Sequence, residues 1–331
     1  GIWGYTARPD SYFEAIRGWQ KRRNGWDIDP KLMSYSLGVV QTISAMVKLF
    51  TPEGGNVLIQ TPVYSEFYDM AEAWNRKVLE NRFREHDGVW QVDWEDFEAK
   101  LQEADLFLLC NPQNHLGIVW EEADLRRMME LCLKHHVLVV SDEIHSDLIF
   151  HGKKHIPTAT LSPEIAANVI TGISGTKTFN LAGLIHSHVV IYDKKLMETY
   201  DAYIKTVGSA EVNIMGVTAL EAAYCGGEEW FENVKALICH NYDYMKQEFA
   251  REVPEIKITP LEGTYLSWLD LRGCMPGDQV AEFIQKKCHL ACDVGEWFSF
   301  TGHGFIRINL ATDTKNIKTA VERIIANIKA L

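Results

Sequence analysis

The sequence lacks the features that mark membrane-spanning, secreted and nucleic-acid-binding proteins. No apolar run approaches the roughly 20 residues that a bilayer-spanning helix needs, and no signal-peptide pattern opens the chain. Lys and Arg number 33 against 45 Asp and Glu, a formal net charge of -12. Because an acidic surface disfavours binding to DNA, RNA and anionic lipid, we expect neither a nucleic acid nor a membrane among the partners.

Paired cysteines are also missing. The seven cysteines include no C-x-x-C pair, their number is odd, and several lie within apolar runs. This pattern is typical of reduced, buried thiols in a cytoplasmic protein. Cys288 and Cys292 lie four residues apart with His289 between them, but no second ligand pair with zinc-site spacing accompanies them. We therefore expect buried packing for these cysteines and no metal site.

Apolar residues are plentiful, at 47% of 331 residues. Short β-branched runs alternate with amphipathic helical stretches, and several runs are apolar almost throughout, as in a parallel sheet covered on both faces. Strands are predicted at 56–60, 105–110, 137–142, 168–173 and 186–192, with helices at 64–74 and 121–135. The alternation predicts an α/β fold with a doubly wound, mostly parallel sheet.

The C-terminal third has a different pattern. A long predicted helix at 232–249 is followed by a few strand-like segments among helices, which is typical of a smaller α+β domain. The predicted strands are 257–258, 265–271 and 305–310, and the predicted helices are 278–287 and 314–328. We place the boundary near residue 232, which divides the chain into domains 1–232 and 233–331.

Four short polar segments stand where predicted strands end. They are NPQN at 111–114, SDEIH at 141–145, SGTK at 174–177 and RIN at 307–309. Ligands of open α/β sheets bind outside the carboxyl ends of the strands. The first three segments are therefore expected to converge on one cleft.

Two residues of this cleft have complementary chemistry. Asp142 follows a buried apolar run, where a carboxylate is stabilised by a cationic partner. Lys177 lies 35 residues later (177 minus 142), and a lysine in a partly buried cleft can serve as a nucleophile. Ser174 and Gly175 leave a hydroxyl and backbone donors for an anion. Spacing alone leaves open a plain salt bridge between Asp142 and Lys177.

The ordered motifs extend that interpretation. N-P-x-N, S-D-E-I-H and S-x-x-K-T-F-N-L-A-G follow one another, with supporting matches in GYT at 4–6, QTPVY at 60–64 and YLSWLDL at 265–271. This set resembles the class I/II aminotransferase-like enzymes of fold type I, which use pyridoxal 5'-phosphate (PLP). More narrowly, it resembles their cystathionine β-lyase, or C–S lyase, branch. The resemblance implies a large PLP-binding domain, a smaller C-terminal domain and a small amino-acid substrate.

The resemblance also implies roles around the cofactor ring. Lys177 would form the Schiff base with PLP and later move the proton at the substrate Cα. Asp142 would pair with the protonated pyridine nitrogen and keep the ring an electron sink. Asn114 and His145 would face the ring's 3-oxygen, and Tyr64 would stack on the ring.

Further implied roles concern the phosphate, the substrate and the partner subunit. The backbone N–H groups of Val40 and Gln41, at the start of a helix, would bind the phosphate, and Ser174 would add its hydroxyl. Arg307 would hold the substrate α-carboxylate with its forked guanidinium. Tyr5 would reach the phosphate of a neighbouring subunit, which implies a homodimer.

Simpler interpretations of these residues remain open. Tyr64 can be a core aromatic, and His145 can be a strand-end histidine with satisfied hydrogen bonds. Arg307 can form an internal ion pair with Asp270 or another carboxylate. The Tyr5 assignment depends on an oligomer.

Two departures from the family pattern bear on function. Where the family has N-P-x-N-P-x-G, His115 and Leu116 precede Gly117, which removes a rigid proline and brings a titratable ring beside the cofactor. The chain also opens directly on GIWGYT, so we expect it to lack the N-terminal segment that borders the substrate and embraces the partner in the family. The resemblance therefore leaves substrate choice and dimer stability open.

Three functions follow. The leading one is a PLP-dependent C–S β-lyase that cleaves cystathionine or cysteine S-conjugates by α,β-elimination to thiol, pyruvate and ammonia. The second is an aminotransferase that uses the same lysine and aspartate. The third is a catalytically inactive relative with a binding or regulatory role, which the missing segment favours and the retained Lys177, Asp142 and Arg307 oppose.

Overall fold

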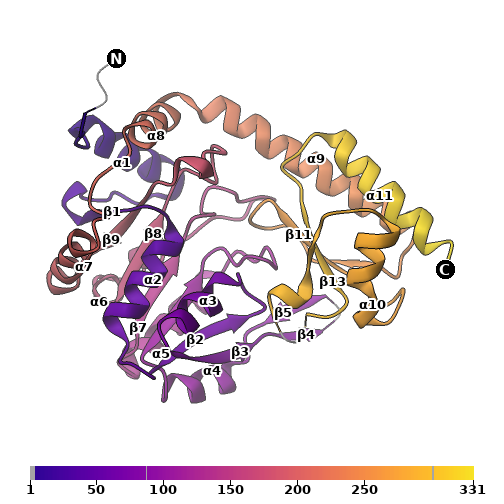
Figure 1. Cartoon of the computed structure of the whole chain (residues 1–331), viewed down its shortest axis with the longest axis horizontal. Coiled ribbons are helices and arrows are strands. Elements are labelled where there is room, and N and C mark those ends of the chain that lie inside the picture. Colours follow the sequence, from indigo (N-terminus) through magenta and orange to yellow (C-terminus); the bar gives the residue numbers. More distant parts are fainter. Residues whose placement is uncertain (1–3, 87, 300–301) are drawn as a thin grey trace.

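Two lobes lie side by side in the computed structural model, which describes residues 4–86, 88–299 and 302–331 (Figure 1). The larger lobe is built around a seven-stranded sheet and the smaller around a four-stranded sheet. Helix α9 (Glu228–Glu252) runs along one edge of the molecule from the larger lobe to the smaller one. The boundary expected near residue 232 falls inside this helix, and the division of the chain at that residue stays a prediction.

The large sheet confirms the predicted fold class. Its strand order is β1-β9-β8-β7-β6-β2-β3, and all neighbours pair in parallel except β9, which is antiparallel to both β1 and β8. The strands are β1 (Met33–Ser36), β2 (Asn56–Thr61), β3 (Lys77–Arg82), β6 (Leu106–Cys110), β7 (Leu138–Asp142), β8 (Val169–Ile173) and β9 (Ser187–Ile191).

Helices cover both faces of this sheet, which explains why its central strands are apolar almost throughout. On β6, Leu106 and Leu108 belong to the cluster that includes α2 (Val39–Phe50). Phe107 and Leu109 face the opposite cluster. The opposite cluster includes residues of α4 (Trp94–Leu101), α5 (Glu122–Lys134) and α6 (Pro163–Ala167). The first cluster also contains residues of α3 (Glu66–Ala73) and α7 (Lys194–Thr206).

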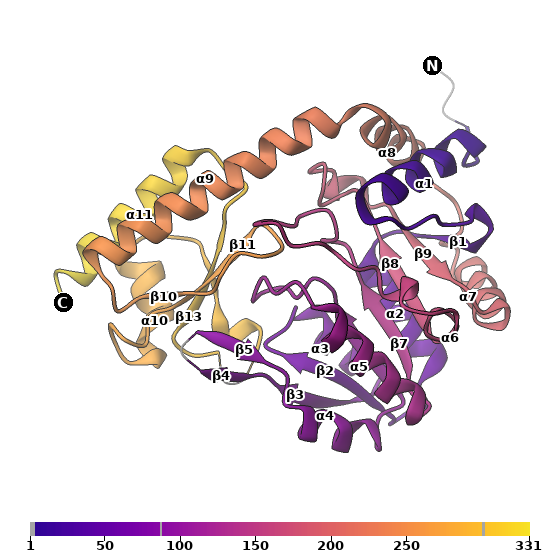
Figure 2. The ribbon, with the colours of Figure 1, turned by 180° about the vertical axis from the view of Figure 1, so that it is seen from behind.

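The smaller lobe is an antiparallel sheet backed by helices. Its order is β10-β11-β13-β12, with β10 (Lys257–Ile258), β11 (Leu266–Asp270), β12 (Asp293–Val294) and β13 (Phe305–Asn309). Helices α9 and α11 (Thr314–Ile328) pack side by side along its outer face (Figure 2), and α10 (Gly277–Glu282) precedes a short helical turn. Leu269, Ile306 and Ile324 share one buried cluster, so the sheet and its helices form a common core.

Several elements were not predicted from the sequence. Edge strands β1 and β3 were missed because neither is an apolar run: MSYS and KVLENR carry mostly polar side chains. The hairpin of β4 (Arg84–His86) and β5 (Val89–Gln91) was missed because each of its strands has only three residues. Helices α1 (Asp10–Asn24) and α8 (Ile214–Gly226), which pack on each other near the N-terminus, were also not predicted.

The cysteines and the helices bear on two further expectations. All seven cysteines are free thiols, with Cys288 buried and Cys292 partly buried. Within the described ranges, no helix is both long and apolar enough to cross a membrane.

Candidate active site

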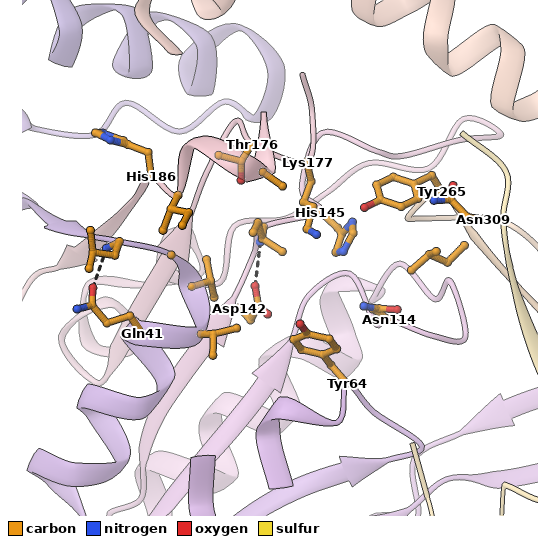
Figure 3. Close-up of a pocket in the computed structure, with 18 of the residues that line it drawn as sticks. Gln41, Tyr64, Asn114, Asp142, His145, Thr176, Lys177, His186, Tyr265 and Asn309 are labelled. Carbon is orange, nitrogen blue, oxygen red and sulfur yellow. Dashed lines mark hydrogen bonds between the residues drawn. The ribbon is translucent and has the colours of Figure 1, made fainter. Parts of the chain in front are cut away.

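A cavity of about 540 Å³ opens where the strand ends of the large sheet meet the smaller lobe. Segments after β6, β7 and β8 supply one side and the start of α2 a second (Figure 3). Residues of β13 and its neighbour β12 supply a third. Its walls include Val40, Gln41, Tyr64, Asn114, Asp142, His145, Thr176, Lys177, Tyr265, Asp293, Arg307 and Asn309. The three polar segments at 111–114, 141–145 and 174–177 therefore do converge on one cleft.

Asp142 ends strand β7 and is buried, with 7% of its surface exposed. Its Oδ1 accepts a hydrogen bond of 3.0 Å from the backbone N–H of Ile144. Burial raises the pKa of Asp142 to about 6, although that hydrogen bond and the charge of Lys177 oppose the increase. A buried carboxylate in this state is stabilised by a cation placed beside it.

Lys177 reaches into the cavity from the turn after β8. Gly175 permits the close packing of this turn, because a Cβ there would lie 2.9 Å from the Tyr224 ring. The Lys177 side chain extends toward His145 and Asp142 (Figure 3). Among the described residues no direct ion pair joins Lys177 to Asp142, and the charge of Lys177 acts on that carboxyl only by opposing the rise in its pKa.

His145 and Asn114 lie on the same side of the cavity. Both are buried, and among the described residues Nδ1 of His145 has no hydrogen-bond partner. Burial, reinforced by the charges of Lys177 and Arg307, lowers the pKa of His145 to about 3, so its ring is neutral. An unsatisfied ring nitrogen at a cavity wall disagrees with the view of His145 as a satisfied strand-end residue.

Tyr64 packs against the large-lobe core with part of its ring and lines the cavity with the rest. Burial, with smaller contributions from Glu66 and Asp142, raises the pKa of Tyr64 to about 12. Its phenol is therefore a neutral group that presents an aromatic surface to the cavity (Figure 3).

The start of α2 offers backbone donors to the cavity. Gly38 is the N-cap and supplies no capping side chain, so the first N–H groups, including those of Val40 and Gln41, have no intrahelical acceptor. The Gln41 side chain holds the preceding turn, because its Oε1 accepts from Leu37 N at 2.7 Å. An exposed set of N–H groups at a helix start favours an anion.

Ser174 occupies a different place from the one expected. Its hydroxyl donates to the backbone carbonyl of His186 at 2.7 Å and lies 2.8 Å from the Thr176 hydroxyl. Thr176, not Ser174, is among the cavity-lining residues. The phosphate role of Ser174 remains a prediction, and Thr176 is the hydroxyl that faces the cavity.

Arg307 projects from β13 and is held by three side chains. Its Nε and Nη2 donate to Oδ2 of Asp293 at 2.9 and 2.5 Å. Its Nη1 lies 2.7 Å from Nδ1 of His115 and 3.2 Å from Oδ1 of Asn114. The internal ion pair considered from the sequence thus forms, but with Asp293; Asp270 pairs instead with Arg272.

Tyr5 is 97% exposed and does not belong to the cavity walls. Its proposed contact with a partner subunit stays a prediction. Among the polar wall residues that sequence reasoning did not single out are Thr176, Tyr265, Asp293 and Asn309. The first two and Asn309 lie within quoted motifs, whereas Asp293 had no signal, because only the pairing of β12 with β13 brings it to Arg307.

The unsatisfied groups of the cavity match the polar groups of PLP. The buried Asp142 carboxylate suits a protonated ring nitrogen, and the start of α2 suits a phosphate. Lys177 supplies a primary amine in the same cavity, and Tyr64 supplies an aromatic surface. These residues fit the cofactor that the motifs imply.

Comparisons with known proteins confirm the family resemblance. The family model described as aminotransferase class I and II matches residues 6–324. Cystathionine beta-lyase PatB of Bacillus subtilis (strain 168) is 37% identical over 327 residues, covering 98% of this chain and 84% of PatB. Protein MalY of Escherichia coli (strain K12) is 30% identical over 338 residues, covering 100% of this chain and 85% of MalY. A crystal structure of cystalysin from Treponema denticola matches with a TM-score of 0.97 at 31% identity, and it contains a PLP cofactor. The match covers 100% of this chain and 84% of the cystalysin chain.

Proposed function

Because this chain belongs to the class I and II aminotransferase family, we propose that it is a PLP-dependent C–S β-lyase. It cleaves cystathionine or a cysteine S-conjugate by α,β-elimination, and the products are a thiol, pyruvate and ammonia. The observation that carries this proposal is the cavity in which Lys177 extends toward the buried Asp142. The identity to cystathionine β-lyase PatB supports the choice of reaction.

In this proposal the chain holds the cofactor through residues of the cavity wall. Lys177 would bind it covalently through its amine, and Asp142 would pair with its ring nitrogen. Asn114 and His145 would provide polar groups for its 3-oxygen, and Tyr64 would provide an aromatic surface for its ring. The first N–H groups of α2, with a hydroxyl from Thr176 or Ser174, bind the phosphate.

When bound, PLP acts as an electron sink that weakens the bonds at the substrate Cα. Arg307 binds the substrate carboxylate and so orients Cα toward Lys177. Once the substrate amine has replaced it, the Lys177 amine would take the Cα proton, and the thiolate would leave Cβ with the electron pair of the C–S bond. One water would then be consumed as pyruvate and ammonia are released. His145 remains neutral at physiological pH, so it can serve as a hydrogen-bond partner without adding a positive charge beside the lysine.

We further propose that the working unit is a homodimer in the cytoplasm. The exposed side chains of Tyr5, Ile185 and Met215 support an interface close to the cavity. Ile185 lines the cavity, and a hydrogen bond from Asn213 to the carbonyl of Leu184 joins its segment to the start of α8. Seven free cysteines support a reducing compartment. A monomeric mass in light scattering would reject the dimer.

The test of the function compares the visible absorbance of the PLP-loaded chain with that of Lys177→Ala. The parent should show the absorbance of lysine-bound PLP, lose it after borohydride treatment, and release pyruvate from cystathionine. Lys177→Ala should do none of these. Lys194→Ala is the matched control, because that lysine is 88% exposed and pairs only with Glu198 among described residues.

A second product assay separates the two enzyme functions. A lyase forms pyruvate in many turnovers from a cysteine conjugate. Stoichiometric keto acid from ordinary amino acids, with no pyruvate from cystathionine, would contradict the lyase and favour an aminotransferase. Absence of any lysine-bound cofactor in the parent would favour the inactive relative.

A further inference from the structure

The guanidinium of Arg307 is almost fully engaged by the protein itself. Arginine has five N–H donors. Asp293 takes the donor of Nε and one of Nη2, and Nη1 is enclosed by Nδ1 of His115 at 2.7 Å and Oδ1 of Asn114 at 3.2 Å. A bidentate grip on a carboxylate needs two donors from one edge of the fork. Asp293 already occupies the Nε–Nη2 edge and the two buried side chains stand beside Nη1, so a substrate carboxylate that takes two donors must displace one of the three partners.

His115 and Asn114 are poor candidates for displacement. Both are buried. The centre of the His115 ring lies 5.6 Å from that of Trp268, in a stacked geometry, and 3.8 Å from that of Phe298. Nδ1 of His115 lies 2.7 Å from Nη1 of Arg307 and 2.8 Å from Oδ1 of Asn114, so its tautomer decides whether it accepts from Arg307 or donates to Asn114. Burial and the charge of Arg307 keep the pKa of His115 well below its ordinary value, so the ring is neutral in either case.

Asp293 is the partner that can leave. Its side chain is 37% exposed, against 12% for Arg307. It stands directly opposite Arg307 in the β12–β13 pair, at the spacing where cross-strand side chains interact. Asp293 also lines the cavity, so its carboxylate occupies the Nε–Nη2 edge from the side on which a substrate approaches.

We propose that Asp293 is a specificity-determining residue that competes with the substrate carboxylate for Arg307. The inference rests on the proposed carboxylate-binding role of Arg307. Binding of an amino acid exchanges one carboxylate for another on the same guanidinium edge and releases Asp293 toward solvent. The competition weakens every ligand that depends on its α-carboxylate, and it leaves amines without a carboxylate unaffected.

The test measures the dissociation constants of L-alanine and ethylamine from the cofactor-loaded protein by absorbance titration. L-Alanine carries the carboxylate but no β leaving group, and ethylamine lacks the carboxylate. Asp293→Ala should bind L-alanine about two- to fivefold more tightly than the parent, the range expected for removing a half-exposed ion pair. Asp293→Asn should lie between the two, and ethylamine affinity should not change. Asp278→Ala, an exposed aspartate of the same lobe, controls for the loss of negative charge.

A second set of variants ties the effect to Arg307. In an Arg307→Gln background, Asp293→Ala should give no gain in L-alanine affinity. Equal or weaker L-alanine binding by Asp293→Ala, or a gain that persists in the Arg307→Gln background, would overturn the inference. These titrations measure binding without turnover, so their outcome can be interpreted even if the protein releases no pyruvate from cystathionine.

Discussion

Asp142→Asn should make the cofactor-free protein more stable, although it removes a residue proposed to hold the cofactor. Asp142 is buried at the end of β7 with a pKa raised to about 6. At neutral pH the fold must therefore keep an ionised carboxylate in a place that favours its neutral form. Asparagine has nearly the same shape, and its Oδ1 can still accept the hydrogen bond from Ile144 N.

The size of the effect follows from the two pKa values. An ordinary aspartate titrates at 3.8 and Asp142 at about 6, a difference of about 2, and each pKa unit is worth about 1.4 kcal/mol. The ionised Asp142 thus lowers the free energy of unfolding by about 3 kcal/mol at pH 7.5. Asp142→Asn should recover as much as this amount in the cofactor-free protein.

The stability difference between Asp142→Asn and the parent should depend on pH in a definite direction. Between pH 3.8 and about 6 the folded state binds more protons at Asp142 than the unfolded state does, so this contribution to stability falls as pH rises and is lost above pH 6. The gain in free energy of unfolding from Asp142→Asn should therefore reach its full value, about 3 kcal/mol, above pH 6 and fall to roughly half of it by pH 5.

Buried histidines oppose this trend in both proteins. His145 and His186 have pKa values lowered to about 3 and about 4, chiefly by burial. They stay neutral in the fold while the unfolded chain takes up protons, so their contribution to stability is lost as pH falls below 6.5. Only the difference between Asp142→Asn and the parent at each pH isolates Asp142.

Urea denaturation of the two cofactor-free proteins, at several pH values from 5.0 to 7.5, measures this difference. If Asp142→Asn were no more stable than the parent at pH 7.5, or if its advantage did not change with pH, the assignment of a costly buried charge to Asp142 would be refuted. The same substitution should weaken PLP binding, because asparagine carries no charge for a protonated ring nitrogen. Greater stability with weaker cofactor binding is the expected signature of a functional residue held at a structural cost.

Two further substitutions test the packing around the cavity. Gly175→Ala should lower the free energy of unfolding by about 1–3 kcal/mol in urea denaturation, because its Cβ would lie 2.9 Å from Tyr224 and 3.0 Å from Leu220; Gly183→Ala, with nothing within 4 Å, is the matched control. His115→Phe keeps an aromatic ring beside Trp268 but removes the ring nitrogen that contacts Arg307 and Asn114, so it should lower that free energy by about 1.5–3 kcal/mol. A stability equal to the parent's in either case would contradict the packing described.

The interior of the fold was accessible from the sequence, and its edges were not. Strands such as β6 and β8 are continuous apolar runs because both of their faces are buried, and this leaves a clear pattern in the sequence. The edge strands β1 and β3 carry mostly polar side chains, and β4 and β5 have three residues each, so what makes them strands is hydrogen bonding to a neighbour. The reversed direction of β9 likewise has no local signal, because its residues are as apolar as those of a parallel strand.

The sequence predicts the gathering of the residues proposed to hold the cofactor more readily than the surroundings of Arg307. Asp142, Lys177, Asn114 and Tyr64 follow strands of one parallel sheet, whose carboxyl ends meet by topology, so motif order predicts that they come together. Ser174 was placed at the right turn, but the direction of its hydroxyl depends on the carbonyl of His186, 12 residues later. Such a choice between nearby acceptors is made by packing and leaves no trace in a motif.

The environment of Arg307 depends instead on the alignment of two strands. Asp293 and Arg307 are 14 residues apart, and they meet because β12 and β13 pair with these two residues opposite each other. A shift of one residue would turn the Asp293 side chain to the other face of the sheet and free the guanidinium edge. The proposed competition at Arg307 therefore depends on a strand alignment that the polar motifs at 111–114, 141–145 and 174–177 do not encode.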